Sequence, residues 1–216
     1  MDVIVRLSRV DSCAVSDALD KLGLSGAVTG LHRLSTDRRI AGRVITVKLE
    51  QDDGRPTALR HLGTAAIDAA HPGDVIVVEQ RTGIDAAAWG GNLALGAKLQ
   101  RVAGVIVDGP VRDVDECRQH DFTLFARTHT ARTARGRIVE TGTNVPIVVG
   151  DIPVAPGDYV VADGTAVVFV GGRDVERVLA VAEDITSRER AMADSLLRGT
   201  SIKEVMGQGY ETMLKR

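Results

Sequence analysis

Gly90-Gly91-Asn92-Leu93 and Val105-Ile106-Val107-Asp108-Gly109-Pro110-Val111-Arg112-Asp113 are the two ends of the stretch that organises this sequence. Between them, the sequence predicts an amphipathic helix that starts at the glycine pair and leads into a buried strand over 105–108. The backbone N–H groups at the start of such a helix have no partners within it and suit a carboxylate or phosphate. Arg112 and Asp113 place a cation beside a hard oxygen ligand, which suits a divalent metal and an anionic substrate. We expect both ends to meet at one edge of a sheet.

The composition of the 216 residues is that of an ordinary globular protein, with 44% hydrophobic and 26% charged residues. Aromatic residues make up only 3%, so aliphatic side chains must form the core. The net charge of −2, without a basic stripe interleaved with aromatic residues, argues against nucleic acid. No apolar run reaches the roughly 18 residues of a membrane span, and the first residues do not read as a signal peptide. Cys13 and Cys117 are isolated, which favours a reducing compartment, so we expect a cytoplasmic protein.

Periodicity along the chain predicts helices and strands that alternate at first, with strands clustering after residue 120. This order predicts the α/β class, with one domain over residues 1–216, a mixed sheet and a long amphipathic helix over about 173–198. The segment 24–41 is expected to be an extended loop, and 127–141, which holds four arginines, a solvated hairpin or loop. Further helices are expected over 11–22 and 54–70, as a helix that ends at 118–120, and as a short tail over 202–216. The expected strands cover 44–49, 75–79, 123–126, 145–149, 159–162 and 166–170.

Each candidate site feature also has an ordinary structural interpretation. Paired glycines before a helix are common, and adjacent opposite charges in a loop are usually just solvated. The position of Arg112-Asp113 just past an apolar strand favours a ligand site, because open α/β sheets bind ligands there. The five histidines share no metal-ligand spacing, which argues against zinc. Ser12 and Ser16 lack the surroundings of a hydrolase nucleophile. Cys117 is most simply a packed small residue.

The residues around the glycine pair and the Arg-Asp pair carry a family resemblance. Trp89 to Leu93, followed by Val102 to Asp113, resembles the 4-hydroxy-4-methyl-2-oxoglutarate/4-carboxy-4-hydroxy-2-oxoadipate aldolases, a family that also contains the regulators of ribonuclease E activity. The family pattern is a glycine, twenty residues, Arg-Asp, two residues and an acid. Gly91, Arg112, Asp113 and Glu116 fit this pattern. The resemblance extends along nearly the whole chain and includes the segments 15–19, 66–70, 72–74 and 156–158.

The resemblance implies a swivelling β/β/α layered domain that assembles as a homotrimer or as a hexamer of paired trimers. It implies a class II pyruvate aldolase that cleaves a 4-hydroxy-2-oxo dicarboxylate to pyruvate and a second oxo acid, and that decarboxylates oxaloacetate through the same enolate. The implied cofactor is Mg²⁺ or Mn²⁺, bound by Asp113 partly through waters. By the same resemblance, Arg112 contacts the substrate and stabilises the enolate, while Gly90, Gly91, Asn92 and Leu93 hold the pyruvate carboxylate.

The chain departs from the family pattern at the start of the helix. Many relatives carry an acid followed by two leucines where this chain has Gly91-Asn92-Leu93, and that acid would hold a metal-bound water. The candidate supporting acids are Glu116 and Glu189, the latter supplied by the C-terminal helix of a neighbouring subunit. On its own, Glu189 is most simply part of the exposed face of its helix.

Two other functions stay open at this stage. The first is a non-catalytic regulatory binding protein of the ribonuclease E inhibitor type. Those family members lack the full Arg-Asp pair, so its presence in this chain favours the enzyme. The second is a divergent member with another metal-assisted reaction on a 2-oxo acid.

Overall fold

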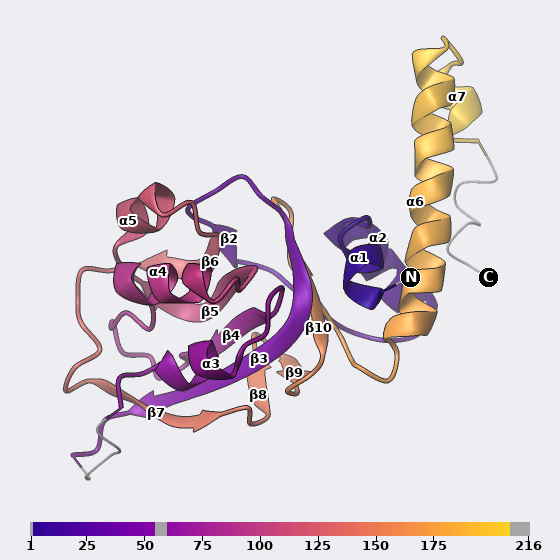
Figure 1. Ribbon diagram of the computed structural model, residues 1–216. Helices are drawn as coiled ribbons and strands as arrows, with labels where there is room; N and C mark the ends of the chain where they lie inside the picture. Colours follow the sequence, from indigo (N-terminus) through magenta and orange to yellow (C-terminus); the bar gives the residue numbers. More distant parts are fainter. Residues whose placement is uncertain (1, 55–59, 208–216) are drawn as a thin grey trace.

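A computed structural model describes residues 2–54 and 60–207, in which a long mixed sheet is covered by helices (Figure 1). The helices are α1 (Val3–Leu7), α2 (Ser12–Lys21), α3 (Thr64–Ala69), α4 (Gly91–Leu99), α5 (Val114–Gln119), α6 (Val175–Leu197) and α7 (Ile202–Val205). The strands are β1 (Ala27–Val28), β2 (His32–Arg33), β3 (Ile40–Gln51), β4 (Val75–Glu79), β5 (Gly104–Val111), β6 (Leu124–His129), β7 (Ile138–Thr143), β8 (Ile147–Val149), β9 (Ile152–Val154), β10 (Tyr159–Ala162) and β11 (Val167–Val170).

The strand β3 joins the two parts of the main sheet. Its first residues pair antiparallel with β10, and Val44–Lys48 then pair parallel with β4. The strands of the sheet lie in the order β1-β11-β10-β3-β4-β5-β6-β2, and β7 pairs with the end of β3. Strands β3 to β6 run parallel, so their carboxyl ends share one edge. The predicted α/β class, mixed sheet and long C-terminal helix are confirmed.

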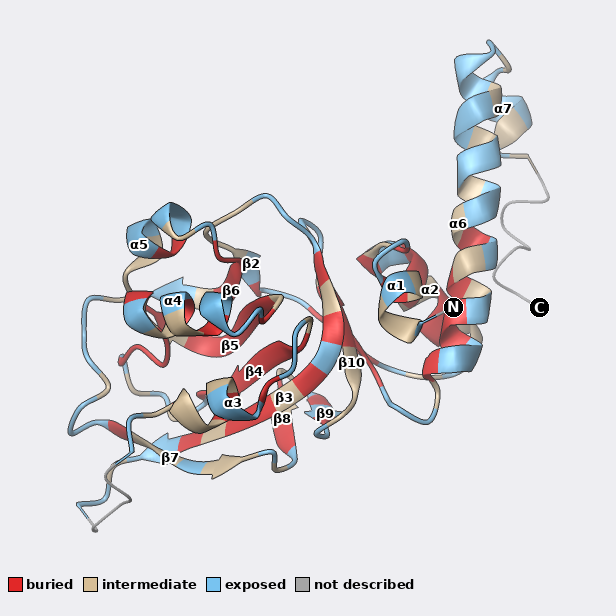
Figure 2. Ribbon diagram, in the orientation of Figure 1, coloured by how far each residue is buried: buried red, intermediate tan, exposed pale blue. Residues whose placement is uncertain are grey.

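Both faces of the parallel strands are buried, which explains their continuous apolar sequences (Figure 2). Helices α3, α4 and α5 cover one face through small residues such as Ala66, Ala94 and Cys117. The β8–β9 hairpin and the strands β10 and β11 pack on the other face, around Ile106 and Phe125. The helices, the sheet and the small hairpin thus form layers, in agreement with the β/β/α arrangement.

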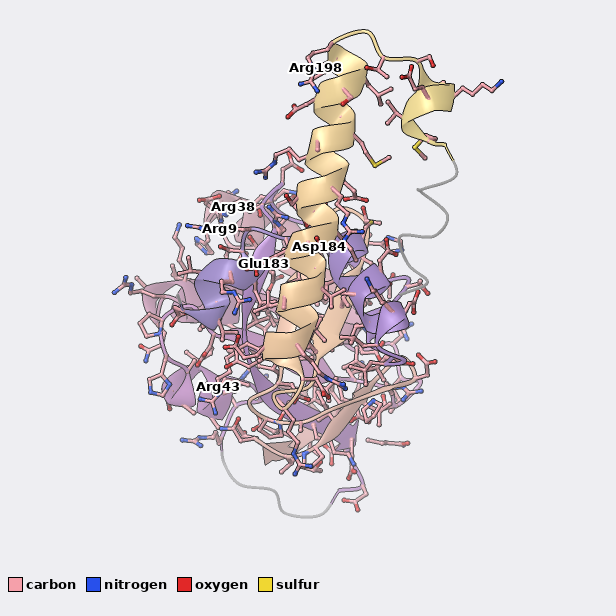
Figure 3. The ribbon with its side chains drawn as sticks, turned by 90° about the vertical axis from the view of Figure 1, so that its right-hand side faces the viewer. Arg9, Arg38, Arg43, Glu183, Asp184 and Arg198 are labelled. Carbon is pink, nitrogen blue, oxygen red and sulfur yellow. The ribbon has the colours of Figure 1, made fainter. Side chains whose placement is uncertain are left out.

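Helix α6 packs on α1 and α2 with its first half only. Val178, Leu179 and Ile185 are buried there, whereas the second half extends beyond the rest of the chain and ends beside α7 (Figures 2 and 3). Arg6 on α1 stabilises the packing of α1 against α6, because its guanidinium donates hydrogen bonds to both carboxylate oxygens of Glu183, each at 2.8 Å. None of the described helices has the length and apolar character needed to cross a membrane.

The structure corrects two of the expected segments. The helix expected over 54–70 is only α3, because Gly63 adopts the left-handed conformation (φ 79°) immediately before Thr64; residues 55–59, and residues 208–216 of the expected tail, lie outside the described part. The expected loop over 24–41 contains the two-residue strands β1 and β2 and the first residues of β3. Strands this short carry too few residues for an alternating pattern.

A half-buried carboxylate ties the start of α2 to the turn between β10 and β11. Asp163 accepts hydrogen bonds from the Ser12 amide (2.8 Å), the Ser12 hydroxyl (2.7 Å) and the Thr165 amide (2.9 Å). Burial acts to raise the pKa of Asp163, but these hydrogen bonds and a weaker one from Ala166 outweigh it and leave the pKa below its usual value.

We expect Asp163→Asn to lower the free energy of unfolding by about 1–3 kcal/mol at neutral pH, because one carboxylate oxygen is replaced by an NH₂ group that faces donors. A carboxylate with a depressed folded-state pKa stabilises the fold above its unfolded pKa of about 4 and loses that effect as the pH falls through the folded value. The difference between the variant and the wild type should therefore shrink below about pH 4 in urea titrations. Asp151→Asn, at an exposed position, is the control. A pH-independent difference would contradict this account.

Candidate active site

The loop before α4 runs beside the end of β5, and this contact brings the two ends of the organising stretch together. The Ala88 amide donates to the Pro110 carbonyl (2.9 Å), and the Arg112 amide donates to the Trp89 carbonyl (3.0 Å). These backbone bonds place the first turn of α4 next to Arg112 and Asp113 at the carboxyl edge of the sheet. The expected meeting of both ends is thus present in the structure.

Asp113 is held in an unusual backbone conformation and points at the start of α4. Its φ of 55° lies in the left-handed region, which Asp tolerates better than most residues. Its Oδ2 accepts from the Gly91 amide (3.1 Å) and from Arg112 Nε (3.0 Å). Its Oδ1 has no hydrogen-bond partner among residues 2–54 and 60–207, so this oxygen is free for a ligand.

The glycine pair allows a close approach between α4 and the Arg-Asp pair. A Cβ atom on Gly90 would lie 2.6 Å from Asp113 Oδ2 and 3.2 Å from Arg112 Cγ. A larger residue at 90 would therefore push the carboxylate away. The amides of Asn92 and Leu93, in the first turn of α4, donate to no partner in the described structure. Two free N–H groups at the positive end of a helix suit an anionic ligand.

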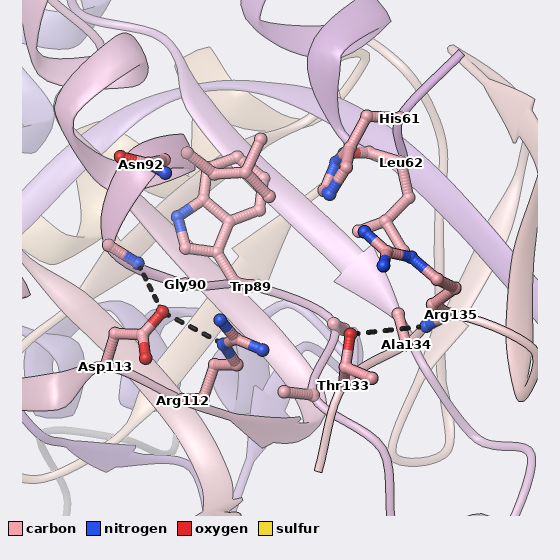
Figure 4. Close-up of a pocket in the computed structure, with 14 residues that line it drawn as sticks. His61, Leu62, Trp89, Gly90, Asn92, Arg112, Asp113, Thr133, Ala134 and Arg135 are labelled. Atoms are coloured by element: carbon pink, nitrogen blue, oxygen red, sulfur yellow. Dashed lines mark hydrogen bonds and ion pairs between the residues drawn. The ribbon is translucent and has the colours of Figure 1, made fainter. Parts of the chain in front are cut away.

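These groups line one pocket of about 400 Å³ (Figure 4). Trp89 is buried beneath it, and its Nε1–H has no hydrogen-bond partner in the described part of the chain. The pocket has the size of ordinary small-molecule sites. Its lining comprises His61, Leu62, 87–93, Arg112, Asp113 and 133–135.

The comparisons with known proteins agree with this architecture. A family model described as RraA-like, Aldolase/RraA, matches residues 12–169. The chain belongs to the RraA-like family. A relative from Halalkalibacterium halodurans with the provisional name 4-hydroxy-4-methyl-2-oxoglutarate aldolase is 31% identical, over 91% of each chain. Protein DlpA of Legionella pneumophila is 24% identical over 94% of this chain, which spans only 33% of that longer protein.

Two solved structures share the fold of this RraA-like chain. An uncharacterized protein from Pseudomonas syringae pv. tomato superposes with a TM-score of 0.85 at 26% identity, over 95% of this chain and 96% of the other. Streptomyces coelicolor RraAS2, described as an unusual member of the RNase ES inhibitor RraA family, superposes with a TM-score of 0.76 at 25% identity, over 87% and 93%.

Glu116 brings a second carboxylate to the start of α4. Its Oε2 lies 1.9 Å from the position that a Cβ atom on Gly91 would occupy. The space that an acidic side chain at 91 would need is thus partly filled by Glu116 of α5. No described residue forms a hydrogen bond with the Glu116 carboxylate, so its oxygens are available to water or a ligand.

The donor set at this corner fits a hard divalent cation. It offers the free oxygens of Asp113 and Glu116, and Mg²⁺ and Mn²⁺ prefer such ligands together with water. Cys117 lies behind them but is buried. Burial, with the nearby charges of Asp113 and Glu116, raises the pKa of its thiol to about 11, so it stays protonated. Within the described ranges, no three His, Cys, Asp or Glu side chains cluster as a ready-made metal cage.

Glu189 lies away from the pocket of its own chain. It sits on α6 beside α2, and burial, followed by the charges of Asp11 and Asp17, raises the pKa of its carboxyl. Its expected role concerns the site of a neighbouring subunit, so it stays a prediction.

Three polar residues that line the pocket were not among the predicted site residues: His61, Thr133 and Arg135. His61 precedes α3, while Thr133 and Arg135 belong to the loop between β6 and β7. The sequence predicts a solvated hairpin or loop for the wider segment 127–141, which holds four arginines. The excess of arginine was the available signal, but no pattern in the sequence shows which one turns toward the site.

We expect Gly90→Ala to lower the free energy of unfolding by about 1–3 kcal/mol, because the added methyl group overlaps the Asp113 carboxylate. The matched control is Gly96→Ala in the same α4, where the nearest atom to an added Cβ is 3.8 Å away. This control should be neutral or stabilising by about 0.5–1 kcal/mol, since Ala favours helices over Gly. Thermal unfolding of both variants distinguishes them, and equal destabilisation would contradict the proposed close contact.

Proposed function

We propose that this RraA-like chain is a class II pyruvate aldolase that depends on Mg²⁺ or Mn²⁺. It cleaves a 4-hydroxy-2-oxo dicarboxylate to pyruvate and a second oxo acid, and decarboxylates oxaloacetate through the same enolate. One observation carries the proposal: a single pocket combines the free amides of α4, the Arg112 guanidinium and the Asp113 carboxylate. The provisional aldolase name of the 31% identical relative supports it.

The start of α4 binds and orients the substrate. The amides of Asn92 and Leu93 hold the carboxylate of the pyruvate portion at the positive end of the helix. The closeness of Gly90 to Asp113 then sets the adjacent 2-oxo group beside the Arg-Asp pair. Fixing the substrate at two points limits its motion and favours the reactive orientation.

Asp113 and Arg112 act on the 2-oxo group. Asp113, with waters and with Glu116 in reach, would hold a divalent cation. That cation would polarise the 2-oxo group, so that its oxygen can take up the negative charge released by C–C cleavage. The Arg112 guanidinium uses only Nε on Asp113, so its other N–H groups can donate to the oxygen on which negative charge develops. The aldol cleavage and the decarboxylation of oxaloacetate both need this stabilisation.

The assembly is part of the proposal. The second half of α6 lies clear of its own chain, with Leu197 and Ile202 exposed near its end (Figure 3). We propose a homotrimer or a hexamer in which this helix packs on a neighbour and supplies Glu189 to the neighbour's site. A cytoplasmic location fits the isolated cysteines, and the partners are small 2-oxo acids.

We expect Asp113→Ala to reduce pyruvate release by at least about 100-fold, and Arg112→Gln to reduce it about 100- to 1,000-fold, as removal of a donor to a developing oxyanion does. A lactate dehydrogenase coupled assay with Mg²⁺ and either 4-hydroxy-4-methyl-2-oxoglutarate or oxaloacetate measures both. Excess chelator should abolish the activity of the wild type.

The control for this test is Asp115→Asn, which removes an exposed acid that pairs with Arg118 at 2.7 Å. It lies two residues from Asp113 and should keep its activity within about two-fold, because exposed ion pairs contribute little. Activity that survives both Asp113→Ala and excess chelator would refute the mechanism.

The alternative function is a regulatory binding protein of the ribonuclease E inhibitor type. The similarity to RraAS2 favours it, since that structure belongs to the RNase ES inhibitor family by its description. Capture of a ribonuclease of this type by the purified chain, together with no turnover of any 2-oxo acid, would reverse our ranking.

A further inference from the structure

Hydrogen bonds hold the loop between β6 and β7 beside the pocket. The Ala87 amide donates to the Arg132 carbonyl (3.0 Å), and Arg137 Nη1 donates to the Thr133 carbonyl (3.2 Å). Ala134 packs against the core, and the Arg135 amide donates to Thr133 Oγ1 (3.4 Å). The loop backbone is therefore fixed without any help from the Arg135 side chain.

The three arginines of this loop have different partners. Arg132 pairs with Asp85 (3.5 Å), and Arg137 donates to carbonyls of the loop itself. The Arg135 guanidinium lines the pocket, and no carboxylate in the described ranges lies within 4 Å of it. A cation without a counter-charge, on a loop held beside a pocket, is available to a bound anion.

The Arg135 guanidinium lies on the side of the pocket away from the Asp113 carboxylate (Figure 4). The carboxylates of Asp113 and Glu116 lie at the start of α4 and α5. His61 and Arg135 lie on the side away from Asp113, beyond Trp89 and Arg112 (Figure 4). A second carboxylate, on a ligand whose first carboxylate is held by the α4 amides, would therefore be repelled by Asp113 and Glu116 and attracted to Arg135. A ligand whose first carboxylate binds α4 would extend its remaining carbons toward Arg135.

We infer that Arg135 binds the distal carboxylate of the substrate and makes the site selective for 2-oxo dicarboxylates over 2-oxo acids with neutral tails. The inference rests on the proposed function, because it uses the first carboxylate at α4 as its reference point. The planar guanidinium presents two parallel N–H groups that match a carboxylate. The Thr133 hydroxyl accepts from the Arg135 amide and keeps its own proton to donate to the same carboxylate.

This assignment separates selectivity from the chemistry. Arg112 and Asp113 act on the 2-oxo group, which every substrate of this class shares. Arg135 contacts only the substituent beyond the carbon–carbon bond that breaks. Its loss should thus raise KM for dicarboxylates much more than it lowers kcat, since this contact is present in the ground state as well as in the transition state.

The test compares two substrates that both release pyruvate: 4-hydroxy-4-methyl-2-oxoglutarate, with a distal carboxylate, and 4-hydroxy-4-methyl-2-oxopentanoate, with a methyl group in its place. We expect the wild type to prefer the dicarboxylate in kcat/KM. Arg135→Gln should reduce that preference at least about 10-fold, as the loss of a hydrogen bond to a charged group does. Arg135→Lys should restore part of it, since the charge returns without the fork geometry.

Arg132→Gln is the matched control, because it removes one positive charge from the same loop but not from the pocket lining. The preference should stay within about two-fold of the wild type in this variant. An equal loss of preference in Arg132→Gln and Arg135→Gln would assign the effect to the general charge of the loop and overturn the inference. An unchanged preference in Arg135→Gln would overturn it as well.

A binding measurement separates failure of this inference from failure of the proposed function. Calorimetry with Mg²⁺ compares 2-oxoglutarate with 2-oxopentanoate, neither of which has the 4-hydroxyl group needed for aldol cleavage. Tighter binding of 2-oxoglutarate that disappears in Arg135→Gln supports the distal site even if no substrate is turned over. Equal binding of the two compounds by the wild type contradicts the distal site, whatever the enzyme catalyses.

Discussion

The hydrogen bond from the Gly91 amide to Asp113 Oδ2, at 3.1 Å, is the contact on which the site depends. It joins the start of a helix to the end of a strand, and it forms only because residue 90 has no side chain and Asp113 adopts a left-handed backbone conformation. Arg112 donates to the same oxygen. A single oxygen of Asp113 thus fixes the start of α4, the Arg112 guanidinium and the free Oδ1 relative to one another.

The parts of the fold and the site that were predictable are those that arise from local pattern. The apolar runs gave β4 and the core of β5, the capping residue Asp11 marked the start of α2, and the Arg112-Asp113 pair stood just past a buried strand. The meeting of the two ends of the organising stretch was also predictable. It follows from the length of a turn, a helix and a parallel strand, which leaves the chain few ways to return to the same edge.

The parts that were not predictable depend on contacts between distant segments. The strands β1 and β2 contain two residues each and exist only because β11 and β6 offer edges to pair with. Arg135 was one of four arginines in a polar stretch, and its loop is held beside the pocket by hydrogen bonds from the Ala87 amide and the Arg137 side chain. Position relative to a pocket is a tertiary property, so a pocket-lining residue such as Arg135 is hard to find from the sequence.

The contact between Gly91 and Glu116 makes two sequence positions behave as one. Because the Glu116 carboxylate stands 1.9 Å from where a side chain at 91 would begin, any side chain at 91 requires Glu116 to move or to become smaller. An acidic residue introduced at 91, as in the relatives, would have to displace Glu116. The second carboxylate of the site would then come from α4 instead of α5, and the site would gain no charge at a new place. The negative charge beside α4 is therefore better regarded as a property of this corner than of either residue, and a search for it by residue position alone would miss it.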